Sequence, residues 1–265
     1  MGLLGTARVT LRLFALAALT AFTVLRMKVS ARLRGGCPHV ATRHGHLWAR
    51  RMVNLLGVKV EVHGIPPTGP VLLLANHRSY VDIAALLAQR PCAFLAKAEI
   101  AEWPLFGAAA RETHTVFVRR EDKASRKAAR GGALALLRQG VAFAAFPEGT
   151  TSRGPGALPF FPGLFELAAE HGISVVPVAI EYASRDDAWV GDDGFIPHFL
   201  GCFRKRRVQV ALAFGPVLHH PDKEGLKREA EAWIRARLQT LAPCGALVRG
   251  EIPRASGPAA APTPA

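Results

Sequence analysis

The chain has 265 residues, which suits one large domain or one domain with appendages. Half of its residues are hydrophobic, enough for a sizeable core, and its mean hydropathy of +0.17 is high for a freely soluble protein. The net charge of +14 predicts an anionic partner, namely a membrane surface, a nucleic acid or a phosphate-rich substrate. The four cysteines are scattered without a Cys-x-x-Cys pair, which argues against a zinc site or a disulfide framework and favours a reducing compartment.

The basic charge is concentrated at the start of the chain, where no Asp or Glu occurs between Met1 and Val60. Residues 13–25 form an apolar run between Arg12 and Arg26. As a helix this run would be about 20 Å long, shorter than the roughly 30 Å hydrocarbon core of a bilayer. A cleaved signal peptide is disfavoured because no convincing cleavage site follows, and the length favours an interfacial anchor over a spanning helix. In both remaining cases we expect a membrane protein whose flanking cations bind anionic lipids of the cytoplasmic leaflet.

The rest of the chain alternates between predicted strands and helices. Residues 39–56 predict a helix, for which a packed and a membrane-facing position are equally open, and residues 58–62 predict an edge strand. Further strands are expected at 71–74, 92–96, 115–118, 141–146, 174–182 and 208–214, and further helices at 79–89, 121–139, 161–171 and 222–241. Pro177 indicates a bulge or an edge position for its strand.

This alternation predicts an α/β fold with a mixed, mostly parallel sheet flanked by helices. We divide the chain into N-terminal membrane-associated helices at residues 1–57 and an α/β domain at 58–242. A tail at 243–265 is rich in Pro, Ala and Gly and is expected to be disordered.

A polar cluster follows directly after the buried strand predicted at residues 71–74. Its central residues are His77 and Asp82, a base and a carboxylate five positions apart. On a continuous helix they would point about 140° apart, so contact between them requires a turn entering a helix, with Ser79 as a suitable N-cap. Asp82 can then accept a hydrogen bond from one ring nitrogen and leave the other as a general base. Taken alone, this spacing is more often a capped loop than a catalytic pair.

Three predicted strands end in polar clusters, which are Asn76-His77, Arg119-Arg120 and Glu148-Gly149-Thr150. Because strands that run together end at the same edge of a sheet, these clusters are expected to converge. They supply a base with its acid, a cation and a second carboxylate. They include no cysteine, and Ser79 lies too close to His77 to be a nucleophile, so the group is suited to activating a substrate hydroxyl. Neither a nucleotide-binding glycine motif nor a metal-ligand spacing is present in the sequence.

Four blocks of sequence, in this order, resemble the glycerolipid acyltransferase family that includes bacterial 1-acyl-sn-glycerol-3-phosphate acyltransferase. They are Asn-His-x4-Asp at 76–82, His-Thr-Val-Phe-Val-Arg-Arg at 114–120, Phe-Pro-Glu-Gly-Thr-Thr-Ser at 146–152 and Val-Pro-Val at 176–178. Between the first two blocks, the family's Lys-x-Glu, Pro and Gly stand as Lys97, Glu99, Pro104 and Gly107. Four blocks in the family's order make the resemblance specific.

The resemblance implies transfer of a fatty acyl group from acyl-CoA or acyl carrier protein to the free hydroxyl of a lysophospholipid, with 1-acyl-sn-glycerol-3-phosphate as the first expectation. It implies that His77 is the general base and that Asp82 orients it. It also implies docking of the N-terminal helices on the cytoplasmic face of the inner membrane. No cofactor, metal or nucleic acid is expected. The implied substrate-binding residues are Asn76, Lys97, Arg120, Glu148, Gly149 and Thr150.

The chain departs from the family's pattern at positions expected near a phosphate. Thr151 replaces an arginine, and the lysine often found before Gly163 is absent. His114 and Arg119 replace a glycine and an aspartate. Arg119 or Arg153 would have to supply the missing cations. These departures leave a lyso-aminolipid such as lyso-ornithine lipid as the main alternative acceptor.

Two other classes of protein remain as minor alternatives. A nucleic-acid-binding protein would be equally basic, but here the charge flanks an apolar run, and only four Trp and two Tyr are available for stacking on bases. A catalytically silent membrane scaffold is disfavoured because the two implied catalytic residues occur together with Glu148 and Arg120.

Overall fold

The fold is built around one seven-stranded sheet. The computed structural model describes residues 3–191 and 193–241. The strands lie in the order β1-β7-β6-β2-β5-β3-β4, and every neighbouring pair is parallel except β6 and β7. Their bounds are β1 Val58–His63, β2 Leu72–Ala75, β3 Ala93–Lys97, β4 Val116–Val118, β5 Phe143–Ala145, β6 Val175–Tyr182 and β7 Val208–Phe214. The predicted mixed, mostly parallel sheet is confirmed, and β1 is the predicted edge strand.

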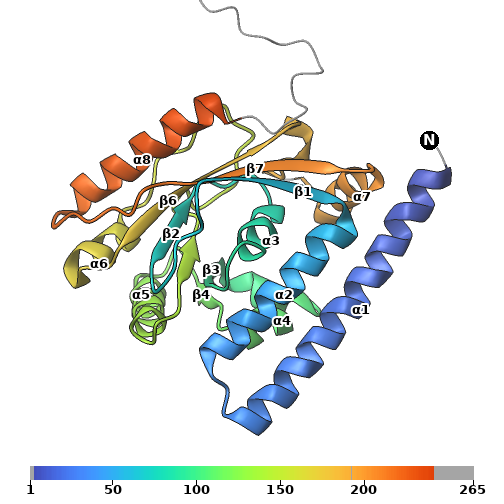
Figure 1. The fold of residues 1–265 in the computed structure, drawn as a ribbon, viewed down its shortest axis with the longest axis horizontal. Helices are drawn as coiled ribbons and strands as arrows, with labels where there is room; N and C mark the ends of the chain where they lie inside the picture. Colours follow the sequence, from blue (N-terminus) through green and yellow to red (C-terminus); the bar gives the residue numbers. More distant parts are fainter. Residues whose placement is uncertain (1–2, 192, 242–265) are drawn as a thin grey trace, which may run out of the picture.

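Helices cover both faces of this sheet (Figure 1). The helices α5, α6 and α8 lie on one face, and α1, α2, α3, α4 and α7 lie on the other. Their bounds are α1 Leu3–Arg34, α2 Pro38–Leu56, α3 Val81–Leu87, α4 Phe106–Glu112, α5 Lys123–Arg138, α6 Gly163–His171, α7 Phe195–Arg204 and α8 Lys223–Thr240, with short 3-10 helices η1 at Ala98–Glu102 and η2 at Arg185–Asp187.

The apolar run of β2 reflects burial on both sides of the sheet. Successive residues of a strand point to opposite faces. Leu72 and Leu74 accordingly pack among residues of α5, α6 and α8, whereas Leu73 packs with residues of α1, α2, α3 and α7. All four residues of β2 are fully buried. A central parallel strand of this kind carries no polar alternation, and its first polar residues mark the point where it leaves the core.

Helix α1 is much longer than the apolar run from which it was predicted. Its 32 residues correspond to about 48 Å, so Arg12 and Arg26 lie inside the helix rather than at its ends. The guanidinium of Arg12 donates hydrogen bonds to the carbonyl oxygens of Phe203 and Lys205, at 2.8 and 2.7 Å, where α7 ends. The helix is therefore longer than the about 20 Å expected from the apolar run, because Arg12 is accommodated inside it by backbone acceptors at the end of α7.

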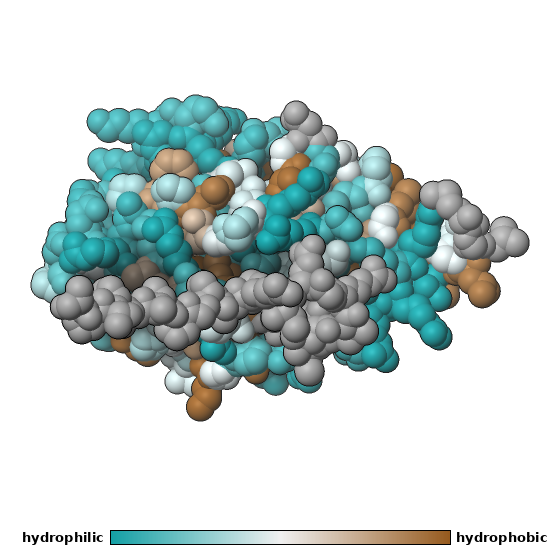
Figure 2. Space-filling model, turned by 90° about the horizontal axis from the view of Figure 1, so that it is seen from above, coloured by the Kyte–Doolittle hydropathy of each residue, from teal (hydrophilic) through white to brown (hydrophobic). Residues whose placement is uncertain are grey.

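By length and composition α1 is apolar enough to cross a membrane. It nevertheless packs on α2, α4 and α7, and the indole N–H of Trp48 in α2 donates to the hydroxyl of Thr20 at 3.0 Å. More than half of the large hydrophobic side chains that are exposed in the described residues lie on α1. By contrast, Figure 2 shows the molecule from above, after a turn of 90° from the view of Figure 1, and the coloured surface on this face is mainly hydrophilic. This packing agrees with a helix that stays on the domain and exposes an apolar stripe.

Helix α2 confirms the predicted helix at residues 39–56, and its buried face resolves the open question of its position. Ala49, Met52, Val53 and Leu56 are buried, and the helix packs against α1, α3 and β1. It is therefore a packed helix. The same core cluster holds residues from both sides of the proposed boundary at residue 57, which itself stays a prediction. The tail predicted at 243–265 lies outside the described residues.

Three local predictions need correction. Strand β6 is an interior strand, not an edge, because it pairs with β2 and β7. Pro177 is tolerated there because the β6–β7 ladder begins at Val178, one residue later. The short helices α4 and α7 were not predicted, and α4 begins within the apolar connection expected at residues 103–107, at Phe106.

Candidate active site

The His77–Asp82 pair forms as predicted, in the loop between β2 and α3. The imidazole Nδ1 of His77 lies 2.8 Å from Oδ2 of Asp82. The same oxygen accepts the backbone N–H groups of Arg78 at 2.6 Å and Ser79 at 2.9 Å. A carboxylate in the first turn of α3 thus folds the preceding loop back over itself, which is the turn that the five-residue spacing required.

The helix begins two residues later than predicted, and Ser79 is not its N-cap. Tyr80 occupies the N-cap position, without a side-chain capping bond. The side chain of Asp82 accepts the backbone N–H groups of Arg78 and Ser79, which precede the helix, and so fixes the chain as it enters α3. The helix also ends at Leu87, short of residue 89.

The ring of His77 is held between its acid and an aromatic neighbour. It stacks on Phe146 with ring centroids 3.9 Å apart and an angle of 9° between the ring planes. Its side chain is 16% exposed. With Nδ1 bonded to Asp82, the ring presents Nε2 as the nitrogen able to take a proton from a substrate. This arrangement suits a general base.

Glu148 fixes the same loop from the end of β5. Its two carboxylate oxygens accept the backbone N–H groups of His77, at 3.3 Å, and Leu158, at 3.1 Å. The side chain is nearly fully buried. Burial raises the pKa of Glu148 to about 7, against the lowering effect of the two N–H donors. In this structure the carboxylate joins two loops of the protein.

The clusters at the ends of β4 and β5 meet as predicted. Arg120 donates a hydrogen bond to the carbonyl oxygen of Gly149, although β3 separates the two strands. Gly149 has φ +72°, and a Cβ there would lie 2.7 Å from Cε2 of Phe161. The position therefore requires glycine. Thr150 is exposed next to it.

The two other predicted residues, Asn76 and Lys97, differ in their exposure to solvent. Asn76 is fully buried, and its amide exchanges two 2.8 Å hydrogen bonds with the backbone of Ile180 in β6. Lys97, at the end of β3, is 47% exposed and pairs with Glu99 at 3.0 Å. Asn76 thus ties β2 to β6, while Lys97 is open to solvent.

The two arginines expected to replace missing phosphate ligands are differently placed. Arg119 is exposed, and its backbone N–H donates to Ser125. Arg153 pairs with Asp193 at 2.7 Å. The guanidinium of Arg153 is therefore already paired within the protein. Arg120 and Lys97 are two exposed cations at the ends of β4 and β3.

Sequence reasoning missed four residues that surround the pair. The hydroxyl of Tyr182 donates to Oδ1 of Asp82 at 2.6 Å. The buried guanidinium of Arg78 donates to Glu181 and, at 2.7 Å, to the hydroxyl of Ser152. Arg78 stands inside the first block, so its position was a signal. The residues at the end of β6 gave no such signal in the sequence, because only the pairing of β6 with β2 brings them to the His77 loop.

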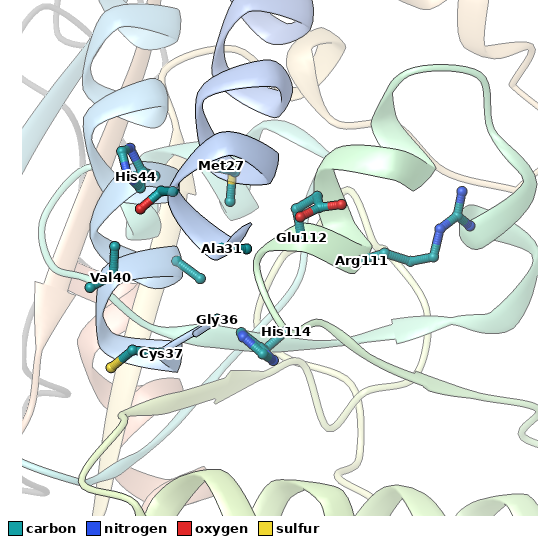
Figure 3. A pocket seen from close by; sticks show the side chains of 11 residues that line it. Met27, Ala31, Gly36, Cys37, Val40, His44, Arg111, Glu112 and His114 are labelled. Atoms are coloured by element: carbon teal, nitrogen blue, oxygen red, sulfur yellow. The ribbon is translucent and has the colours of Figure 1, made fainter. Parts of the chain in front are cut away.

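A cavity of about 180 Å³ lies elsewhere, between the end of α1, the start of α2 and α4 (Figure 3). Met27, Cys37, Val40 and His114 are among its lining residues, and none of the predicted site residues lines it. His114 has φ +57°, a left-handed conformation that explains why glycine is usual at this position. Among residues 3–191 and 193–241, no group of three or more His, Cys, Asp or Glu side chains is placed to hold a metal ion.

Comparisons with known proteins identify the family of this chain. Residues 59–181 match the Acyltransferase family. A lyso-ornithine lipid O-acyltransferase from Brucella abortus is 32% identical, over 96% of this chain and 100% of its own length. Another from Pseudomonas aeruginosa is 37% identical, over 72% and 76%.

Enzymes named for a phosphate acceptor are also similar to this chain. A 1-acyl-sn-glycerol-3-phosphate acyltransferase from Neisseria meningitidis is 36% identical, over 56% of this chain and 59% of its own length. The crystal structure of the 1-acyl-sn-glycerophosphate acyltransferase PlsC from Thermotoga maritima has the same fold, with a TM-score of 0.67, 24% identity and coverage of 93% of this chain and 98% of that one. The chain belongs to the acyltransferase family that contains the lyso-ornithine lipid and 1-acyl-sn-glycerol-3-phosphate O-acyltransferases.

Proposed function

We propose that this acyltransferase uses His77 as a general base to acylate the hydroxyl of a lysolipid at a membrane surface. Nε2 of His77 takes the proton of the acceptor hydroxyl while the oxygen of that hydroxyl attacks the carbonyl carbon of an acyl thioester. The carbon–sulfur bond breaks, an ester forms, and the imidazolium returns the proton to the leaving thiolate. Asp82 holds the ring through Nδ1 and stabilises its charged form. This His77–Asp82 contact is the observation that carries the proposal.

The remaining predicted residues divide into two roles. Arg120, Lys97 and Thr150 lie at strand ends with exposed side chains, and we assign them to the acceptor headgroup. Asn76, Glu148 and Gly149 shape the loops around His77 through bonds within the protein. Acyl-CoA or acyl carrier protein supplies the thioester, and the reaction as written needs no cofactor.

For the acceptor we propose lyso-ornithine lipid. Thr151 replaces a phosphate-facing arginine, and the guanidinium of Arg153 is already paired with Asp193. An ornithine headgroup has a carboxylate and an ammonium and no phosphate, so the single bidentate donor Arg120 suffices for its anionic group. The relative from Brucella abortus, which aligns over 96% of this chain, carries this substrate in its name.

1-Acyl-sn-glycerol-3-phosphate is the second candidate, because Arg120 and Lys97 remain as two cations near the strand ends. The test offers each acceptor separately to the purified protein in detergent or vesicles, with a labelled acyl thioester of CoA and of carrier protein. Label in the doubly acylated ornithine lipid supports the proposal. Label only in phosphatidic acid assigns the second acceptor, and label in neither with either donor overturns both.

We further propose that α1 docks on the cytoplasmic face of the inner membrane. Leu4, Leu11, Phe14, Phe22 and Leu25 are all more than half exposed along α1. The exposed cations Arg26, Lys28 and Arg32 flank this stripe at its C-terminal end. Such a helix binds by burying apolar area and by attraction to anionic lipid. The described cysteines, all free, suit a reducing compartment.

The docking test uses charges introduced on two different surfaces. Phe14→Glu with Phe22→Glu should abolish sedimentation with vesicles that contain anionic lipid. The matched control, Ile65→Glu with Val217→Glu, changes two exposed apolar side chains outside α1 and should sediment like wild type. Equal loss in both double variants, or in neither, would contradict the assignment to α1.

A further inference from the structure

The carboxylate of Asp82 is held by four donors from two directions. Its Oδ2 accepts the imidazole and the two backbone N–H groups of the loop. Its Oδ1 accepts one donor, the hydroxyl of Tyr182, at 2.6 Å. Both side chains are buried. The phenol is thus the only donor outside the β2–α3 loop that fixes the rotation of this carboxylate among the described residues.

Tyr182 belongs to a stretch of β6 that contacts the loop repeatedly. Ile180 exchanges two backbone hydrogen bonds with the amide of Asn76. Glu181 accepts from the guanidinium of Arg78 at 2.9 and 3.3 Å. Alternate side chains of a strand point to opposite faces, so Glu181 and Tyr182 contact the loop from two sides. The end of β6 therefore acts as a fixed support for the loop that carries His77.

Other charged groups surround this contact. Glu148 bonds to the backbone of His77 from β5, Arg78 lies in the same loop, and Asp187 in η2 also influences Tyr182 electrostatically. None of these groups donates a hydrogen bond to Oδ1 of Asp82 in the described part of the chain. A phenol O–H bonded to a carboxylate is a short, charge-assisted contact, and its loss leaves a buried oxygen without a donor.

We propose that Tyr182 is a positioning residue for the acyl transfer, since its hydroxyl holds Asp82 in the rotation that aligns the imidazole of His77. This inference rests on the proposed function. Tyr182 is buried and its hydroxyl bonds to Asp82, so we expect its loss to act on the proton-transfer step and not on binding. A catalytic base must lie within hydrogen-bond reach of the proton that it removes, and a rotated carboxylate misplaces the ring.

The test compares Tyr182→Phe with Tyr80→Phe, the other tyrosine of the chain. Tyr80 bonds to His198 and leaves the contacts of Asp82 intact. For Tyr182→Phe we expect kcat to fall at least tenfold while KM for both substrates stays within twofold. For Tyr80→Phe we expect both constants within twofold of wild type. An unchanged kcat in Tyr182→Phe, or a loss confined to KM, would overturn the proposal.

A second readout does not need turnover. The imidazole N–H proton of His77, assigned by its absence in His77→Gln, should shift in the proton NMR spectrum of Tyr182→Phe and not in that of Tyr80→Phe. If the protein transfers no acyl group, the proposed function fails while this signal still tests the contact. A purely structural role for the phenol predicts a lower melting temperature with an unchanged signal.

Fluorotyrosine covers the case in which Tyr182→Phe does not fold. In the Tyr80→Phe background, 3-fluorotyrosine replaces position 182 alone and keeps its shape, but the hydroxyl becomes a stronger donor. We then expect a shifted His77 N–H signal and an altered kcat in a folded protein. An unchanged signal and an unchanged kcat would refute the positioning role.

Discussion

The buried carboxylate of Glu148 should make the stability of this protein fall between about pH 4.5 and pH 7. Burial raises its pKa from an ordinary value of 4.5 to about 7. Within this window the folded state binds more protons than the unfolded state, so the free energy of unfolding decreases as the pH rises. The stabilisation is fully present below pH 4.5 and is lost as the pH passes 7. A shift of about 2.5 pKa units corresponds to about 3 kcal/mol.

Glu148→Gln removes this titration while keeping a side chain of the same shape. The amide retains one acceptor oxygen for the backbone N–H groups of His77 and Leu158, so it loses a hydrogen bond at every pH. Relative to wild type, the variant should therefore become more stable by about 3 kcal/mol on going from pH 4.5 to pH 8. Urea unfolding of both proteins in the same detergent at the two pH values measures this change. A stability difference independent of pH would refute the reasoning.

Three further substitutions test separate parts of the structure. His77→Ala should abolish acyl transfer and leave vesicle sedimentation unchanged, and retained turnover would remove His77 from the role of base. Gly149→Ala should lower the free energy of unfolding by about 1–3 kcal/mol, because φ +72° disfavours a Cβ and Phe161 occupies its space. Adding Phe161→Ala should restore part of the lost stability in urea unfolding. No recovery would mean that backbone strain alone causes the loss. His114→Gly should raise the melting temperature, since it relieves a left-handed histidine at φ +57° that costs about 1 kcal/mol; a lower melting temperature would contradict this.

Patterns local in the sequence predicted most of the sheet and the first half of the site. The apolar run at residues 71–74 identified β2 because a strand buried on both faces must be apolar throughout. The polar residues that follow it marked the strand's end and placed His77 and Asp82 within one turn. Their five-residue spacing required a loop entering a helix, and the 2.8 Å contact confirms it.

Local patterns failed where the partner of a residue lies far along the chain. Arg12 was taken as the end of an apolar run, but carbonyl oxygens of α7 accept its guanidinium and α1 continues past it. Ser79 has the chemistry of an N-cap, yet the carboxylate of Asp82 accepts its backbone N–H and that of Arg78, and the helix begins only at Val81. In both cases the helix boundary depends on a hydrogen-bond acceptor that the local sequence pattern does not reveal.

The sequence by itself determined the alternation of strands and helices, the base with its acid, and the polar residues at three strand ends, because each depends on residues near in the chain. Only the tertiary structure decided which groups complete that cluster. The pairing of β6 with β2 brings Glu181 and Tyr182 to the loop of His77, about a hundred residues earlier in the chain. The reason is physical: a hydrogen bond needs its two atoms about 3 Å apart, and only the order of strands in the sheet sets that distance for residues so far apart in sequence.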